Sequence, residues 1–435
     1  MNPETVGQPS LSHGLWQASA AAAPSTVPLQ TDIEVDVAIV GGGFTGLSCA
    51  LHLQLKGAKT AVIEEATIGY GGSGRNVGLV NAGMWVMPSE LPGALGAVYG
   101  QRLLDLLGAG PDLVFELIVR YGIDCEPVRQ GTLHCGVGRA GLANIGQRCR
   151  EWQAHGAPVR LLDAEETARR TGTDAYAGAL LDERAGTVQP LAYARGLAHA
   201  AAAEGAALFT GSKVVSAEDR HDGWVLRTNT GGSVKARWVV VATNAFTGLD
   251  GPWAPIRTEL VHLPYFNMAT PPLTPKLLQK ILPNREGAWD TPDVLTSFRL
   301  DRAGRLVFGS VGALRGTGAS VHRGWGRRAM TKLFPELRDV GFDYEWYGWI
   351  GMTSDALPRL HRLARNVVSF SGYNGRGIAT GTTFGKELAG LIAGEIADED
   401  MVLPFTDPQV TPFRNLREAY YEAGAQFAHI TAARF

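Results

Sequence analysis

The clearest pattern of apolar positions lies near the start of the chain, over residues 35–65. Residues 35–40 form a short run rich in β-branched side chains, which is typical of a buried parallel strand. Residues 47–55 are apolar at helical spacing, and residues 61–63 form a second short apolar run. The pattern therefore predicts one complete strand–turn–helix–strand unit.

The rest of the chain alternates between helical periodicity and short strand-like runs. Helices are expected over residues 99–121, 164–170, 190–204 and 380–396. Glycine-containing turns at residues 230–232 and 301–304 predict two β-hairpins. Strands are expected at residues 125–137, 208–209, 213–217, 224–228, 233–238, 239–242, 297–300, 305–310, 344–350 and 367–370.

The order of these segments predicts two interleaved domains, which the length of the chain allows. The first domain, which contains the unit at residues 35–65, is expected to comprise residues 32–87, 181–255 and 352–400. The substrate domain is expected to comprise residues 88–180 and 256–351. Residues 1–31 are expected to form an extended lead-in, and residues 401–435 a polar helical tail on the surface. This layout predicts a substrate pocket between the domains.

Three glycines follow the first predicted strand in the spacing G-x-G-x-x-G, namely Gly41, Gly43 and Gly46. The first allows a tight turn, the second lets the backbone approach a pyrophosphate, and the third lets helix and strand pack closely. The following helix directs its free N–H groups and positive dipole end at the phosphates. Glu64 ends the second strand, where a carboxylate can accept hydrogen bonds from ribose hydroxyls. These residues predict a dinucleotide site and, by themselves, leave NAD and FAD open.

Two further glycine-rich stretches could contact the same nucleotide. The sequence GGSGRN at residues 71–76 lies where a loop would run back along it, and its backbone amides with Ser73, Arg75 and Asn76 are candidates for phosphate and flavin contacts. A solvated surface charge is the alternative for Arg75. Residues 371–377 follow a predicted strand and precede a predicted helix, so they offer a second set of dipole-aligned N–H groups.

Composition and charge argue against several classes of function. The 435 residues carry a formal charge of −2, so there is no global basic field for nucleic acid or for an anionic membrane. No apolar stretch approaches the roughly 20 residues that span a bilayer, and the N-terminal segment lacks the pattern of a signal peptide. The four cysteines lack metal-ligand or disulfide spacing, which fits a reducing compartment. We therefore expect a soluble cytoplasmic protein without a metal site.

Several motifs together resemble the D-amino-acid oxidase-type flavoprotein superfamily, in its glycine and sarcosine oxidase branch, and most nearly its γ-glutamylputrescine oxidase-like members. They are GGGFTGLSCALHL (41–53), GGSGRN (71–76), VVVATNAFT (239–247), FRLDRAGRLVFGS (298–310), WIGMTSDALPRL (349–360) and SGYNGRGIATGTTFGKELAGLIAG (371–394). The resemblance implies an α/β fold. In it, a Rossmann-like FAD-binding domain of the glutathione-reductase type is interleaved with an α+β substrate domain built on an antiparallel sheet.

The resemblance also implies FAD as the cofactor and assigns its contacts. The pyrophosphate would be held at Gly41, Gly43 and Gly46, and the ribose by Glu64. The flavin side would be followed by Ser73, Arg75 and Asn76. The adenine would meet the backbone of Val214, and the isoalloxazine would meet Gly372, Gly375, Gly377 and Ile378. Some relatives attach FAD through a C-terminal cysteine, but this chain has none after Cys149 and no histidine in residues 71–76, so non-covalent FAD is expected.

Departures from the family pattern concern the substrate. Glycine oxidase-like members carry carboxylate-binding arginines at the positions of Gly351 and Gly375, and their loss here argues against a simple α-amino acid. γ-Glutamylputrescine oxidase-like members usually have histidine at the position of Arg376. A guanidinium there can bind a carboxylate or stack on an aromatic ring.

Amine oxidation by a flavin requires a neutral substrate nitrogen, which an aromatic pocket favours by desolvating the ammonium form. Candidates for such walls are Tyr265, Phe298, Trp346, Trp349 and Tyr373, with simple core packing as the alternative for each. Arg299 and Arg376 are candidates for a substrate carboxylate such as that of a γ-glutamyl group, with a structural salt bridge as the alternative for Arg299. The predicted catalytic set is Arg299, Arg376, Tyr265, Trp349 and Tyr373.

The expected function is the oxidation of a C–N bond of a small amine by hydride transfer to flavin N5. The imine is then hydrolysed, and O2 is the expected electron acceptor. One alternative is a flavin dehydrogenase that oxidises a secondary amino acid or a 2-hydroxy acid and passes electrons to a quinone. Another is an FAD-binding subunit of a larger complex. The oligomeric state stays open, and no nucleic-acid partner is expected.

Overall fold

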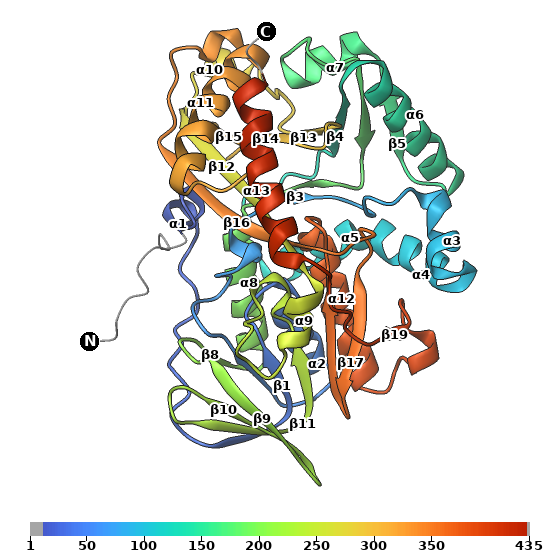
Figure 1. Ribbon diagram of the computed structural model, residues 1–435, viewed down its shortest axis with the longest axis vertical. Coiled ribbons are helices and arrows are strands. Elements are labelled where there is room, and N and C mark those ends of the chain that lie inside the picture. Colours follow the sequence, from blue (N-terminus) through green and yellow to red (C-terminus); the bar gives the residue numbers. More distant parts are fainter. Residues whose placement is uncertain (1–11, 433–435) are drawn as a thin grey trace.

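Two large β-sheets organise the protein in the computed structural model, which describes residues 12–432 (Figure 1). A nine-stranded sheet lies in the lower part of the view and an eight-stranded sheet in the upper part. The C-terminal helix α13 (Arg414–Thr431), drawn in red, runs down the front of the upper part. Of the lead-in and tail predictions, residues 1–11 and 433–435 lie outside the described residues.

The nine-stranded sheet is built around β1 (Ile33–Val40), which pairs in parallel with β11 (Ser233–Val241) and with β2 (Thr60–Ile63). Helix α2 (Phe44–Leu55) connects β1 to β2, so the predicted strand–turn–helix–strand unit is confirmed. Both faces of β1 are buried in hydrophobic clusters, which explains its β-branched run. The sheet also contains β8 (Ala207–Phe209), β9 (Val214–Arg220), β10 (Gly223–Thr228), β17 (Arg359–Ala364), β18 (Val367–Ser371) and β19 (Phe405–Thr406).

The eight-stranded sheet has the order β16–β12–β15–β14–β13–β4–β6–β5. Its strands are β4 (Thr132–Gly136), β5 (Val159–Leu162), β6 (Gly178–Asp182), β12 (Val261–Pro272), β13 (Gly287–Asp290), β14 (Thr296–Leu300), β15 (Arg305–Val311) and β16 (Tyr344–Met352). Every pair is antiparallel except β13 with β4, where the two excursions of the chain meet. The predicted antiparallel sheet is thus confirmed apart from this one parallel pair. A separate ribbon joins β3 (Leu79–Val80) to β7 (Gly186–Thr187).

The helices agree with the sequence pattern in part. The helix predicted over 99–121 is two helices, α4 (Ala97–Gly108) and α5 (Gly110–Tyr121), because the chain bends at Ala109 before Pro111. The helices α6 (Gly138–Ala154) and α11 (Gly316–Leu333) were not predicted. The α-helices other than α2 and α13 are α1 (Leu15–Ser19), α3 (Leu91–Leu95), α4 (Ala97–Gly108), α5 (Gly110–Tyr121), α6 (Gly138–Ala154), α7 (Ala164–Thr171), α8 (Pro190–Ala203), α9 (Ala254–Glu259), α10 (Pro275–Leu278), α11 (Gly316–Leu333) and α12 (Gly377–Ile392).

Both ends of the described chain pack against the rest of the protein. Trp16 on α1 is fully buried and donates from Nε1 to the carbonyl of Asn76 over 2.9 Å. Beyond residue 400, β19 joins the nine-stranded sheet beside β17, and α13 packs on the eight-stranded sheet. Within residues 12–432, no helix is long and apolar enough to cross a lipid bilayer.

Candidate active site

One large cavity, with a volume of about 1800 Å³, lies between the two sheets. Its walls come from the carboxyl ends of β1 and β2, the loop after β18 and one face of the eight-stranded sheet. In open parallel α/β sheets, ligands bind at the carboxyl ends of the strands. The cavity therefore lies where the predicted nucleotide site requires it.

The N-terminus of α2 opens into this cavity. Gly41 has a φ of +111°, a conformation that favours glycine, and a Cβ on Gly46 would lie 2.1 Å from the Gly41 carbonyl oxygen. Gly43 is the N-cap residue and supplies no side-chain cap, and a Cβ there would lie 2.8 Å from Ser73 Oγ. The three glycines therefore provide the tight turn, the close packing and the accessible backbone that a pyrophosphate needs.

Glu64 follows β2 at the same edge of the sheet and lines the cavity. Its Oε2 accepts a hydrogen bond from the Gly42 N–H over 2.7 Å, and its Oε1 accepts one from the Ala66 N–H over 2.8 Å. Burial raises the pKa of this carboxyl, while the two amide donors lower it. Each oxygen keeps a further lone pair, so the fixed side chain can accept from a ribose hydroxyl.

The 71–76 loop lies beside α2, and its three predicted side chains all line the cavity. Ser73 Oγ accepts from the Phe44 N–H over 3.1 Å. Arg75 is 1% exposed and lies 4.4 Å above the Tyr70 ring, so the alternative of a solvated surface charge is wrong. The side chain of Asn76 is hydrogen-bonded to three backbone groups of residues 72–78, so it shapes the loop.

A second helix N-terminus, that of α12, opens into the same cavity. Gly375, Gly377 and Ile378 line it, and no side chain caps this end. Gly372 does not line the cavity, because its N–H is turned to Asn244 Oδ1 at 3.0 Å. Of the predicted second set of backbone amides at the helix N-terminus, only those of residues 375–378 can therefore face the cavity.

Tyr373, in the loop before α12, connects the N-terminus of α12 to that of α2. Its hydroxyl lies 2.7 Å from Thr45 Oγ1 on α2 and donates to the Phe370 carbonyl over 3.1 Å. Burial raises the pKa of this phenol, which therefore stays protonated. These contacts are those of a positioning residue that fixes the loop before α12.

This arrangement fits a bound FAD. The cavity extends from Val214, at the start of β9, past the N-terminus of α2 to the N-terminus of α12. An elongated dinucleotide with an anionic centre matches a cavity with two helix dipole ends and a ribose acceptor between them. The glycines at 41, 43 and 46 leave room that side chains would fill.

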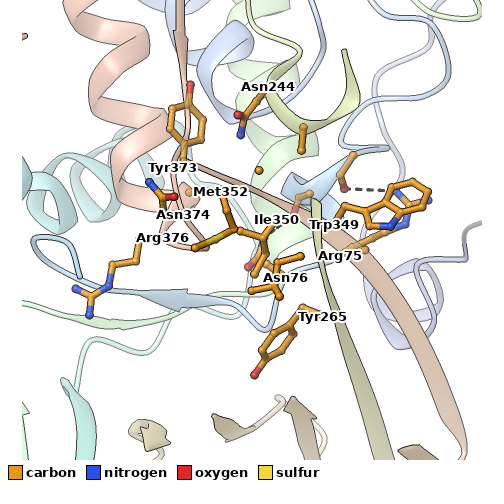
Figure 2. A pocket seen from close by; sticks show the side chains of 18 of the residues that line it. Arg75, Asn76, Asn244, Tyr265, Trp349, Ile350, Met352, Tyr373, Asn374 and Arg376 are labelled. Carbon is orange, nitrogen blue, oxygen red and sulfur yellow. Dashed lines mark hydrogen bonds between the residues drawn. The ribbon is translucent and has the colours of Figure 1, made fainter. Parts of the chain in front are cut away.

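The strand register shows which face of the eight-stranded sheet looks into the cavity. Trp289 pairs with His134 on β4 and with Ser297 on β14, and directly paired residues point to the same face. The hydroxyl of Tyr265 lies 2.6 Å from Ser297 Oγ. All four side chains line the cavity (Figure 2 shows Tyr265 below Ile350). His134, Tyr265 and Trp289 form an aromatic wall opposite the nucleotide side.

Comparison with known proteins identifies the family. Residues 36–391 match the family model described as "DAO: FAD dependent oxidoreductase". The chain belongs to this family. It is therefore an FAD-dependent oxidoreductase, as the motifs predicted.

Individual relatives agree with this membership. Over 427 residues the chain is 32% identical to gamma-glutamylputrescine oxidoreductase of Escherichia coli (strain K12), covering 92% of this chain and 96% of that one. It is 27% identical over 372 residues to glycine oxidase of Geobacillus kaustophilus, covering 82% and 92%. The crystal structure of the latter superposes with a TM-score of 0.68 at 23% identity over 87% of this chain and 98% of that chain. The fold class predicted from the sequence is confirmed.

Within this FAD-binding fold, Arg299 does not line the cavity, which corrects its proposed substrate contact. It is 1% exposed, donates to the Val188 carbonyl and lies 3.7 Å from a carboxylate oxygen of Glu126. Its guanidinium also lies over the Trp16 ring at 5.5 Å. Arg299 shares a sheet face with Ser297, but α1 covers that part of the face. The structural salt bridge, the alternative left open by the sequence, is the observed arrangement.

The aromatic residues predicted to form the pocket walls differ in where the structure places them. Phe298 and Trp346 are core residues that do not line the cavity. Trp349 pairs with Pro264, one position from Tyr265, so its side chain points to the other face of the sheet, where it stacks on His262. Figure 2 shows Trp349 and Arg376 on opposite sides of Ile350. Trp349 therefore borders the cavity from a different side than Tyr265.

Several cavity residues were missed by the sequence analysis. Trp85, His134, Arg148 and Trp289 line it beside the predicted Arg376, and Tyr420 and Tyr421 reach it from α13. Arg148 lies on α6, a helix that the sequence pattern did not predict. Residues 132–136 and 287–290 join only through the parallel pairing of β4 and β13, which no local pattern reveals.

Proposed function

We propose that this protein oxidises a C–N bond of a small amine, in particular a γ-glutamyl amine or a related primary or secondary amine. The observation that carries the proposal is the cavity itself, which joins two helix N-termini on one side to an aromatic sheet face on the other. Its relative named gamma-glutamylputrescine oxidoreductase, matched over nearly its whole length, supports this substrate class.

On the cofactor side, the place of each residue along the cavity indicates which part of FAD it would contact. The amides at Gly43 and at the start of α2 would hold the pyrophosphate, Glu64 the ribose, and the backbone at Val214 the adenine. FAD supplies the hydride acceptor for the oxidation. The amides at Gly375 and Gly377, at the positive end of α12, would stabilise negative charge near the flavin.

On the substrate side, the aromatic wall excludes water from the amine. Desolvation by Tyr265 and Trp289 disfavours the ammonium form and leaves the nitrogen lone pair available. Burial raises the pKa of the Tyr265 hydroxyl, so this group stays neutral and adds no charge. Hydride transfer needs no general base, because the electron pair of the α C–H bond leaves with the hydride while the lone pair of the neutral nitrogen forms the C=N bond. The imine product is then hydrolysed by water.

Purified protein tests the proposal directly. We expect a bound flavin, bleached anaerobically by γ-glutamylated diamines and regenerated by air with one equivalent of hydrogen peroxide. Dye reduction without peroxide would assign a dehydrogenase, and bleaching by 2-hydroxy acids alone would overturn the proposal for amines. Acid precipitation should release all flavin into the supernatant. In the described residues no cysteine lines the cavity.

A further inference from the structure

Arg376 is held in an unusual position in the cavity wall. It is only 9% exposed, and its guanidinium lies over the rings of Trp85 and Trp289, at 4.7 and 5.0 Å from their centres. The two indoles meet edge to face at 5.1 Å, and Trp85 Nε1 donates to the Asn374 carbonyl over 2.5 Å. Stacking of this kind fixes the plane of a guanidinium and leaves its edge for ligands.

Arg148 approaches the same wall from α6. It is 7% exposed and donates to the carbonyls of Met84 and Trp85 over 3.1 and 2.6 Å, while Arg376 donates to the carbonyl of Ala82 over 3.0 Å. The two arginines, one on α6 and one just before α12, thus hydrogen-bond to the same short segment, residues 82–85. Both act on the neighbouring His134 and hold its pKa well below the ordinary value, after the larger effect of burial.

Neither guanidinium has a counter-ion in the part of the chain that the structure describes. No carboxylate of residues 12–432 lies within 4 Å of Arg148 or Arg376. Asp182, the acid that acts on Arg376 from further away, is bound by Arg184 through two hydrogen bonds of 2.9 and 2.7 Å. The Nε atoms of both buried arginines also lack partners. Glu151 and Glu90 act on Arg148 only from beyond 4 Å. A buried charge without a counter-ion in contact is expensive, and a ligand anion would offset that cost.

We infer that Arg148 and Arg376 form a carboxylate-binding subsite of the cavity, and that the substrate carries a carboxylate remote from its reacting amine. This inference rests on the proposed function and specifies its substrate class. A carboxylate accepts bidentate donation from a planar guanidinium, and the carbon chain next to it can lie on the Trp289 ring. The substrate is therefore an ω-amine with a carboxylate at its far end.

Matched substrates provide the test. N-(γ-glutamyl)-1,4-diaminobutane carries the carboxylate, and N-(4-aminobutanoyl)-1,4-diaminobutane is the same amine without it. We expect Arg376→Gln and Arg148→Gln each to raise KM for the first at least 10-fold and to change KM for the second less than 3-fold. Arg129→Gln, which removes an exposed ion pair with Asp112, is the matched control and should change neither. Equal losses for both substrates would show that the arginines only shape residues 82–85 and would overturn the inference.

Two measurements on the wild-type holoprotein keep the test valid if the variants do not fold. The first substrate should have at least a 10-fold lower KM than the second, and equal values would contradict the subsite. Glutarate, a dicarboxylate without an amine, should raise the melting temperature and perturb the flavin absorbance. If no amine bleaches the flavin but glutarate still binds, the proposed function fails while the carboxylate site stands. If amines bleach it and glutarate has no effect, the subsite fails alone.

Discussion

Gly46 packs against Gly41 so closely that a Cβ on Gly46 would lie 2.1 Å from the carbonyl oxygen of Gly41. This contact joins the first turn of α2 to the end of β1. It therefore sets the position of the helix N-terminus that faces the nucleotide side of the cavity. The oxygen belongs to the backbone, so it cannot move aside as a flexible side chain could.

Gly46→Ala should therefore displace α2 from β1 and weaken FAD binding. Overpacking of this kind costs about 1–3 kcal/mol, so we expect lower flavin content on purification and a lower melting temperature. Gly93→Ala is the matched control, because Gly93 is also helical and an added Cβ there meets nothing within 4 Å. Full flavin occupancy in Gly46→Ala would contradict the role assigned to this contact.

Arg299→Met should reduce stability without changing substrate binding, because Arg299 is paired with Glu126 away from the cavity. Removing one partner of a buried ion pair leaves the other charge uncompensated and costs about 3–5 kcal/mol, measurable by urea unfolding. The double variant E126Q/R299M should recover part of this loss. Arg302→Met, which breaks the neighbouring exposed pair with Asp124, should cost no more than about 1 kcal/mol. A raised KM with unchanged stability would instead restore Arg299 to the substrate site.

The nucleotide half of the site could be predicted because its chemistry is local in sequence. Gly41, Gly43, Gly46 and Glu64 lie within one strand–helix–strand unit. The glycines have backbone roles and Glu64 a carboxylate role that few other residues can fill. The second glycine loop was found for the same reason. Gly372 was predicted to contact the flavin, but it does not line the cavity; only the fold shows that its N–H turns to Asn244.

The substrate half could not be predicted because it depends on strand register. Tyr265 and Trp349 both lie on aromatic strands, but the pairing of β12 with β16 turns them to opposite faces. Arg148 was not predicted as a site residue, because the glycines at 138, 141 and 146 obscure the helical pattern of α6, which carries it. The same holds for α11, with glycines at 316, 318, 324 and 326.

Acid should loosen α13 from the eight-stranded sheet. His322 and His429, both buried, lie with their Nδ1 atoms 2.8 Å apart, and His429 Nε2 lies 3.2 Å from Ser310 Oγ. Burial lowers the pKa of His322 to about 4, with Glu422 opposing the effect. Burial lowers the pKa of His429 to about 3, and His322 and then Arg328 add to this effect. Both folded pKa values lie below that of the unfolded chain, so this stability is complete above pH 6.5 and is lost as pH falls toward 4.

Hydrogen exchange of α13 at pH 7 and pH 5 measures this effect. The expected slope is roughly 1–3 kcal/mol per pH unit once both histidines contribute. His429→Gln can keep hydrogen bonds to its neighbours but does not titrate, so it should flatten the slope. The exposed His155→Gln should leave it unchanged. Equal opening free energies of α13 at both pH values in the wild type, after correction for the slower intrinsic amide exchange at pH 5, would contradict the coupling.

Asp290 should give the folded protein a pH dependence of stability opposite to that of the two histidines. It ends β13, is 7% exposed, and its Oδ1 accepts from the Thr296 N–H over 2.7 Å. Burial raises its pKa to about 7, and no cation of residues 12–432 lies within 4 Å to lower it. Because the folded protein holds this proton more tightly than the unfolded chain, its contribution is complete below about pH 4 and is lost as pH rises through 7.

Asp290→Asn mimics the protonated carboxyl and should remove this dependence. In urea unfolding, wild type and variant should be similar at pH 4, and the variant should be more stable at pH 8. One pKa unit corresponds to about 1.4 kcal/mol, so the difference at pH 8 should be on the order of 2–4 kcal/mol. Asp293→Asn, in the exposed loop that follows, should show no such divergence. A wild type that matches Asp290→Asn at pH 8 would mean that Asp290 ionises in the folded protein at little cost, with water reaching its carboxylate through the cavity it lines.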